Sequence, residues 1–278
     1  MSALRRPTRL PFRVELARQL SQWRVRIALI VLAVLPVVVR IALLVGGPPA
    51  SSRSGTTDLT ALAQVSGGTF AAFVLVLTGG FLATLVAALL FGDLIAGEAS
   101  RSTLKYLLTV PVPRLRLLAV KVQVATVLLV AGLLALTLVA LLVGVLSYGA
   151  GGIQVPGGPR LGFGDSVLRL LAATGAAIVG LLWAAALGTL LTVVSDSPLA
   201  AAGGVVLASI LSRILDQIPA LGDLRVVLPT HWSTAFRSFL EVPVDLAPPA
   251  DALLSGLLWA IVLGALAAWR FTRKDISG

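Results

Sequence analysis

The sequence predicts an all-α, polytopic membrane protein with six transmembrane helices. Of its 278 residues, 58% are hydrophobic and only 12% are charged, and the mean hydropathy is +1.00. Soluble domains are only about half apolar, so this composition indicates an integral membrane protein. A helix needs about twenty residues to cross the hydrocarbon core of a bilayer. Six apolar runs approach or exceed that length: 27–44, 70–91, 117–146, 167–194, 199–215 and 253–269.

The distribution of charge predicts the orientation of these spans. With a cytosolic N-terminus, 15 of the 22 Lys and Arg fall on the cytosolic side against 5 of the 12 Asp and Glu, which leaves that side with the whole net charge of +10. Positive residues concentrate on the cytosolic side of membrane proteins. Both termini are therefore predicted to be cytosolic, in a cell (plasma or inner) membrane. The same bias accounts for the net charge without a nucleic-acid partner.

Residues 1–26 are predicted to be a cytosolic lead followed by an amphipathic helix. From about Phe12 to Arg26, Leu16 and Leu20 share one face with Trp23, while Arg18 and Arg26 lie on the other with the remaining polar side chains. A cation-rich amphipathic helix before a span is typical of one that lies in the membrane interface, with its Trp at the headgroup level. The alternative is that these residues only supply orienting charge.

Segment 92–116 is the longest strongly charged interruption between two apolar runs. Ser100 or Ser102 is predicted to cap a short helix that Pro111 ends. Leu104, Leu107 and Leu108 then share one face of that helix, and Arg101 shares another with Lys105. The pattern predicts a short amphipathic helix close to the inner membrane surface.

Spans two to four carry no ionisable residue between positions 70 and 91, 122 and 146, or 170 and 194. Ion-coupled transporters generally need carboxylates or broken helices near the bilayer midplane, so the sequence favours a process driven from outside the membrane. Small residues also recur every four positions in span four, and such a face favours close helix packing, either within the chain or at a dimer seam. They are Ala172, Ala176, Gly180, Ala184 and Gly188.

Beyond span five, residues 219–250 are too apolar for a free loop and too interrupted by proline for a span. They are predicted to form one or two short re-entrant helices in the outer leaflet. Arg213 and Asp216, three residues apart at the end of span five, are predicted to pair. His231 is the only histidine of a chain without cysteine, so a metal role there is unsupported. The unit from 27 to 270 is then the six-span domain, and 271–278 a cytosolic tail.

The sequence lacks the motifs of nucleotide hydrolysis and of hydrolase chemistry. None of the three lysines lies in a G-x-x-x-x-G-K-[ST] loop, and there is no H-E-x-x-H or G-x-S-x-G. No catalytic, cofactor or metal residue is predicted, and an intramembrane enzyme is a distant alternative.

The charged segment carries a resemblance to a known family. The strings GDLIAGE at 92–98, STLKYLL at 102–108 and PVPR at 111–114 resemble the signature of ABC transporter permeases of the type 2 exporter family, with Ser102 where that family usually has Gly. The resemblance implies an N-terminal elbow helix at Arg18, Trp23 and Arg26. It also implies a cytosolic coupling helix that docks on a separate ATPase. The residues assigned to that docking interface are Asp93, Glu98, Arg101, Lys105, Tyr106 and Arg114.

The resemblance therefore implies a permease subunit of an ATP-driven exporter. It would form a homodimer or a heterodimer with a related permease and work with two ATPase chains, which would hold the ATP and Mg²⁺. For Glu98 a local bridge to Arg101 is the alternative to an ATPase contact. An ion-coupled or uncoupled channel, and a scaffold that recruits an ATPase without transport, are the alternative functions. A lipid, a drug-like amphiphile, a peptide or a metal-linked sulfur species would each suit an apolar pathway.

Overall fold

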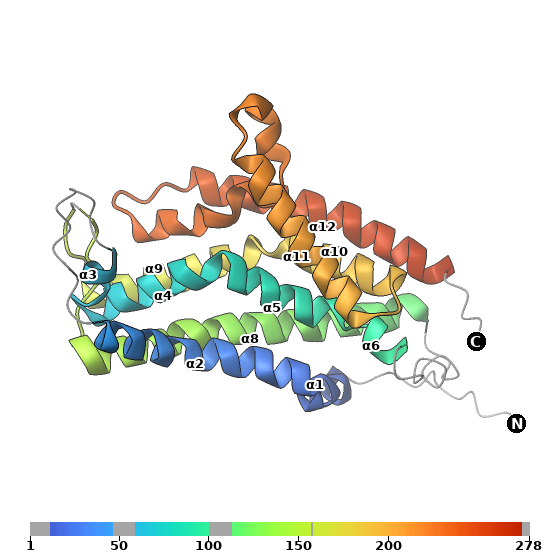
Figure 1. The fold of residues 1–278 in the computed structure, drawn as a ribbon, viewed down its shortest axis with the longest axis horizontal. Helices are drawn as coiled ribbons and strands as arrows, with labels where there is room; N and C mark the ends of the chain where they lie inside the picture. Colours follow the sequence, from blue (N-terminus) through green and yellow to red (C-terminus); the bar gives the residue numbers. More distant parts are fainter. Residues whose placement is uncertain (1–11, 47–58, 100–112, 157, 274–278) are drawn as a thin grey trace, which may run out of the picture.

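The computed structural model of the chain describes residues 12–46, 59–99, 113–156 and 158–273, and they form a bundle of roughly parallel helices (Figure 1). Apart from helices, the described residues contain one isolated β-bridge, between Gln154 and Arg160. The all-α class predicted from the sequence is confirmed. The short helices α3 (Leu59–Ala63) and α6 (Ala96–Ala99) lie at opposite ends of the bundle.

Five of the described helical segments are long and apolar enough to cross a bilayer, and a sixth span results if a bent pair counts as one. These five agree with the predicted runs. They are α2 (Trp23–Val45), α8 (Arg114–Tyr148), α9 with α10 (Phe163–Val179 and Leu182–Val194), α11 (Pro198–Asp216) and α12 (Ala247–Arg273).

The predicted second span, 70–91, is the bent pair. It consists of α4 (Gly67–Gly79) and α5 (Phe81–Gly92), and the chain bends by 57° between them. Gly80 between them has φ −79° and ψ −94°, outside the helical region. The ring of Phe236 lies where a side chain on Gly79 would be, so the break is packed against the chain from outside the pair. The expectation of one continuous helix was wrong at this Gly–Gly step.

The N-terminal amphipathic segment is divided differently from the prediction. Helix α1 (Phe12–Ser21) ends before Trp23, which instead begins α2. Its polar face packs on the protein, because Glu15 and Gln19 are buried, while Phe12 and Leu20 on the apolar side are exposed. An exposed apolar side is what an interfacial helix requires; the membrane position of α1 stays a prediction.

The region 219–250 contains two 3₁₀ helices, η1 (Pro219–Val227) and η2 (His231–Leu240), before α12 begins at Ala247. Helix α11 crosses the bundle obliquely, and its far end projects beyond the other helices together with η1 (Figure 1). One or two short helices were expected here, but their depth in the bilayer stays a prediction. The expected pair of Arg213 with Asp216 is wrong, because Asp216 pairs with His231 at 2.6 Å.

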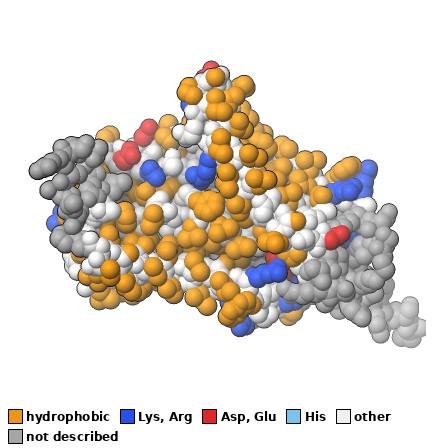
Figure 2. Space-filling model, in the orientation of Figure 1, with side chains coloured by type: hydrophobic (Ala, Val, Ile, Leu, Met, Phe, Trp, Pro, Cys, Tyr) orange, Lys and Arg blue, Asp and Glu red, His pale blue; other side chains and the backbone are white. Residues whose placement is uncertain are grey.

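The middle of the bundle is apolar, both inside and outside. Leu32, Phe70, Leu133 and Leu136 have no exposed surface and belong to one contiguous core. Hydrophobic side chains also cover much of the outer face between the two ends, and basic side chains gather near the end where α12 finishes (Figure 2). An apolar belt between charged ends is the surface expected of a bilayer-spanning protein.

Candidate functional site

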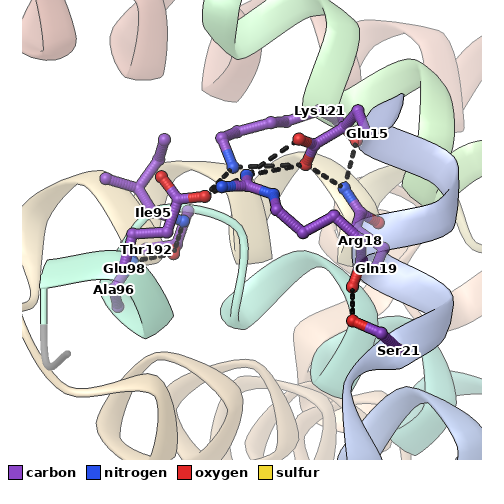
Figure 3. Close-up of polar contacts among 9 residues, drawn as sticks. All are labelled: Glu15, Arg18, Gln19, Ser21, Ile95, Ala96, Glu98, Lys121 and Thr192. Atoms are coloured by element: carbon purple, nitrogen blue, oxygen red, sulfur yellow. Dashed lines mark hydrogen bonds and ion pairs between the residues drawn. The ribbon is translucent and has the colours of Figure 1, made fainter. Parts of the chain in front are cut away.

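Four charged side chains meet at the end of the bundle where α1, α6 and α8 come together (Figure 3). Lys121 Nζ lies 2.5 Å from Glu98 Oε1 and 3.3 Å from Glu15 Oε1. Arg18 pairs with both carboxylates, at 2.8 Å from Glu15 Oε2. Gln19 Nε2 donates to Glu15 Oε1 at 3.0 Å and to the Lys121 carbonyl at 3.4 Å. We call these five residues the ion cluster.

Three of the charged groups in the ion cluster are almost fully buried. The side chain of Lys121 is 2% exposed, that of Glu15 is 1% and that of Glu98 is 6%, whereas that of Arg18 is 34%. Removing charges from water is costly unless each is paired and hydrogen-bonded. Two carboxylates and two cations satisfy that condition with no net formal charge, so the cluster ties its three helices together through mutually dependent pairs.

The pKa values of Glu15 and Arg18 reflect the same balance between burial and ion pairing. Burial raises the pKa of Glu15, but the Lys121 ammonium, the Gln19 amide and the Arg18 guanidinium together outweigh it and hold that pKa below its usual value. Burial lowers the pKa of Arg18, but the carboxylates of Glu98 and Glu15 more than compensate, so its pKa is raised. Both residues are therefore held in their charged forms.

A neutral contact fastens the same region to α10. Thr192 Oγ1 accepts hydrogen bonds from the backbone N–H groups of Ile95 and Ala96, each at 3.0 Å. These N–H groups open α6, where a helix has no backbone acceptors of its own. Nearby, Arg24 on α2 pairs with the buried Asp93 at 3.2 Å. The short stretch 93–98 is thus held by α1, α2, α8 and α10.

Two glycines allow the end of α5 to approach its neighbours closely. A Cβ on Gly92 would lie 2.9 Å from the backbone nitrogen of Ala202 on α11, and a Cβ on Gly188 of α10 would lie 2.9 Å from Phe91 Cβ. Only glycine permits either contact without displacement of a helix. The helix that leads into stretch 93–98 is therefore in direct contact with α10 and α11.

The structure describes three of the residues predicted for the docking interface, and each contacts a different partner. Glu98 belongs to the ion cluster, Asp93 pairs with Arg24, and Arg114 Nη1 donates to the Thr272 carbonyl at 3.3 Å. The other predicted docking residues, and the short helix expected between Ser100 and Pro111, lie outside the described residues; these are Arg101, Lys105 and Tyr106. Contact of this set with an ATPase stays a prediction.

The residues predicted for the elbow are in three different environments. Arg18 lies in the ion cluster, Trp23 is 72% exposed at the start of α2, and Arg26 Nε donates to the Leu20 carbonyl at 2.6 Å. An exposed Trp next to an exposed Arg agrees with an interfacial position.

The predicted small-residue face is only partly packed within the chain. Ala184 and Gly188 on α10 are buried, whereas Ala172 on α9 is exposed, and Ala176 and Gly180 are half-buried. The face is interrupted because the helix breaks between α9 and α10. Whether this face also forms the contact between two subunits of a dimer stays a prediction.

Four residues of this site were not predicted as site residues from the sequence: Glu15, Gln19, Lys121 and Thr192. A signal for two of them existed: Lys121 stands alone inside the apolar run 117–146, and Glu15 is one of few acids near the cytosolic end. A lone cation in an apolar run requires an acid partner. Among the described residues, no group of three or more His, Asp or Glu is placed to hold a metal ion.

These features define a multi-pass α-helical membrane protein whose helices are fastened at one end by buried ion pairs. The family model described as ABC-2 family transporter protein matches residues 20–212. The chain therefore belongs to the ABC-2 transporter family and is a membrane-spanning transport component. The matched range runs from the end of α1 to within α11 and includes the ion-cluster residues Glu98 and Lys121. None of the curated proteins matches the chain.

Proposed function

We propose that the chain is the permease subunit of an ATP-driven exporter, powered by a separate ATPase subunit that binds the ATP and Mg²⁺. The ion cluster is the observation that carries this proposal. It holds α6, which leads directly into the segment that resembles a coupling helix, against α1 and α8. A permease that receives work from another subunit needs such a firm attachment at the receiving end.

The contacts around α6 provide a route for displacement into the bundle. Movement of the segment after α6 would act on α8 through Lys121, on α10 through Thr192, and on α5 through the chain itself. Breaking one buried ion pair is costly, because it leaves an uncompensated buried charge. The ion cluster therefore resists local deformation. Such a displacement would therefore reach the spans instead of being absorbed at the bundle end.

The proposed assembly contains two permeases and two ATPase chains. We propose that Arg101, Lys105, Tyr106 and Arg114 contact the ATPase, because charges on a cytosolic helix can pair across an interface. Glu98 is buried in the ion cluster, and we propose that it holds this segment in position. The proposed location is the plasma or inner membrane, with both termini in the cytosol.

Purification of the tagged chain from its own membranes tests this function. We expect an ABC-type ATPase to co-purify, and we expect ATP hydrolysis by the complex to exceed that of the ATPase alone. Glu98→Gln removes one charge at constant shape, so it should lower the permease-dependent hydrolysis several-fold while the bound ATPase stays at the wild-type ratio.

Asp165→Asn is the matched control, since the Asp165 carboxylate is 51% exposed and pairs only within α9 in the described structure. Its complex should hydrolyse ATP at the wild-type rate. Absence of any ATPase would contradict the proposed function. An ATPase that co-purifies with Glu98→Gln and is stimulated fully would contradict the role given to Glu98. Ion flux into vesicles without ATP would favour a channel.

A further inference from the structure

A groove of about 340 Å³ opens between α8, α10 and α12. Its two long walls are formed by α8 between Leu115 and Thr126 and by α12 between Ala260 and Ala268. A Cβ on Gly264, midway along the α12 wall, would meet nothing within 4 Å. The space beside α12 is therefore open, and among the described residues that line the groove none is charged.

The surface of the groove is apolar. Two threonines line it, but Thr126 Oγ1 donates to the Val122 carbonyl at 2.9 Å, and Thr189 Oγ1 donates to the Ala185 carbonyl at 2.8 Å. Both hydroxyls thus serve their own helices. The other described lining residues are Ala, Leu, Val, Phe and Gly. Left empty, such a groove loses dispersion contacts along its walls, so it favours an apolar occupant.

The length of the groove limits what can fill it. At a rise of about 1.5 Å per residue, the α12 wall from Ala260 to Ala268 is about 12 Å long, and the α8 wall is about 16 Å long. The hydrocarbon core of a bilayer is about 30 Å thick, so the groove extends over about half of it, which is one leaflet. A transmembrane helix of a second subunit would extend past both ends of the groove, whereas it would contain one acyl chain of a lipid.

One end of the groove lies where α8 begins and α12 finishes (Figure 1). There Arg114 Nη1 on α8 donates to the Thr272 carbonyl on α12 at 3.3 Å, which joins the two walls. Next to Ala268, Trp269 is 51% exposed, and the guanidinium carbon of Arg273 lies 4.8 Å from the centre of its ring. An exposed Trp stacked with an Arg is typical of the headgroup level of a membrane. The groove therefore runs from the hydrocarbon region to the level of the headgroups.

Cations are in excess at this end of the groove. The exposed ones in the two helices are Arg116, Arg270 and Arg273, and basic side chains gather at the end of α12 in Figure 2. The four helices that line the groove contain one acid, Asp251, which lies near the opposite end of α12. The adjoining sequence adds Asp196 after α10, and Lys274 with Asp275 after α12. These additions leave the net charge positive.

We propose that this groove binds an anionic phospholipid, with one acyl chain between α8 and α12 and the headgroup against Arg116 and Arg273. Basic sites at the ends of membrane helices suit phosphate-bearing headgroups. Both guanidinium groups are exposed, so their N–H donors are accessible to phosphate oxygens. The proposal goes beyond the proposed function and does not depend on it, because the site belongs to this chain alone.

Lipid binding to the purified full chain tests the headgroup contact. Dioleoyl phosphatidylglycerol is titrated into the protein in neutral-detergent micelles, and bound lipid is measured by native mass spectrometry. Dioleoyl phosphatidylcholine is the lipid control, because it has the same chains and no net charge. We expect wild type to bind the phosphatidylglycerol at least about fivefold more tightly, since each arginine near an anionic headgroup contributes a factor of about five. The double variant Arg116→Gln/Arg273→Gln should lose most of this preference, whereas Arg225→Gln in η1, which does not line the groove, should keep it.

Filling the groove tests the acyl chain separately from the charge. Gly264→Leu should weaken phosphatidylglycerol binding several-fold while every arginine is present. Gly175→Leu is the matched control, because a Cβ on Gly175 in α9 also meets nothing within 4 Å, and it should bind as wild type does. Equal binding of the two lipids by wild type, or unchanged binding by Gly264→Leu, would overturn the proposal. A Gly264→Leu chain that binds lipid normally but changes its oligomeric state would assign the groove to a second subunit instead.

A measurement on wild-type protein covers the case in which a variant does not fold. Phosphatidylglycerol with a diazirine in one acyl chain, added at an equimolar ratio and activated by light, should label peptides from the two walls, 115–126 and 260–268. Excess phosphatidylglycerol should suppress this labelling, and an equal excess of phosphatidylcholine should not. Labels spread equally over the exposed faces of α2 and α11 would show unspecific contact and overturn the site.

Discussion

Lys121 is the residue on which the ion cluster depends, because it is the most buried cation and it contacts both carboxylates. Its ammonium lies 2.5 Å from Glu98 and 3.3 Å from Glu15. Arg18 also contacts both carboxylates, but its side chain is 34% exposed, so water partly screens its charge. The pairs are therefore not interchangeable: Lys121 cannot be removed without leaving buried negative charge.

Lys121→Met should destabilise the chain by about 3 kcal/mol or more, which is the order of the cost of breaking a buried pair by removing one partner. Unfolding of purified protein in mixed micelles measures the loss. The double variant Glu98→Gln/Lys121→Met should lose less than the sum of the two single variants, because the two residues share one interaction. Additive losses would show that the pair is not coupled.

The lowered pKa of Glu15 gives the cluster a defined dependence on pH. A carboxyl group whose pKa is lower in the folded state contributes stability above its unfolded value, near 4.5, and that stability is lost as the pH falls through the folded value. Wild type should therefore exceed Glu15→Gln in stability at pH 7, and the difference should shrink below about pH 4.5. Melting of both proteins from pH 7 to pH 3.5 measures it. A difference that grows towards acid pH would contradict the lowered pKa.

At the scale of the elements, glycines bring the end of α5 into close contact with α10 and α11. Gly92 meets the backbone of Ala202, which cannot move aside as a flexible side chain would. Overpacking of such a contact displaces a helix and costs about 1–3 kcal/mol. The bend at Gly80 and the packing at Gly92 place α5 apart from α4 and in contact with the ion-paired end of the bundle.

Gly92→Ala should thus lower both the stability and the ATP coupling of the chain, although alanine is the better helix former. Gly175→Ala is its counterpart, since a Cβ on Gly175 in α9 would meet nothing within 4 Å. That variant should be neutral or stabilised by up to about 1 kcal/mol. Unfolding of the two proteins side by side gives the comparison, and equal effects would show that the α5–α11 contact is not tight.

The elements that follow from composition and hydrophobic period could be predicted from the sequence. The features that depend on contacts between distant segments could not. The long apolar runs had to be helices, because a bilayer offers no partners to an open backbone. The Phe236 ring packs against Gly79 beside the break, and these two residues are far apart in the sequence. Similarly, the polar face of α1 was recognisable from its period, but Lys121 as its partner became visible only once α1 packed against α8.

For the whole molecule, the ion cluster and the ends of the helices define one pole of the bundle. Helices α1 and α6, the start of α8 and the end of α12 all lie there (Figure 1). At the opposite pole lie α3 and the turn after α8. The positive-inside rule predicts that the first pole is cytosolic, because the sequence segments expected on that side carry most of the excess Lys and Arg.

The chain has no cysteine, so single cysteines can report this orientation without background. Ser21→Cys places a thiol at the end of α1, and Ala150→Cys places one beyond α8; both positions are exposed. In intact cells, a membrane-impermeant maleimide should label Ala150→Cys and leave Ser21→Cys unlabelled until the membrane is opened. Lys105→Cys should behave as Ser21→Cys does. Labelling of Lys105→Cys from outside would reverse the topology and remove the ATPase from its proposed docking segment, because ATP and its hydrolases act in the cytosol.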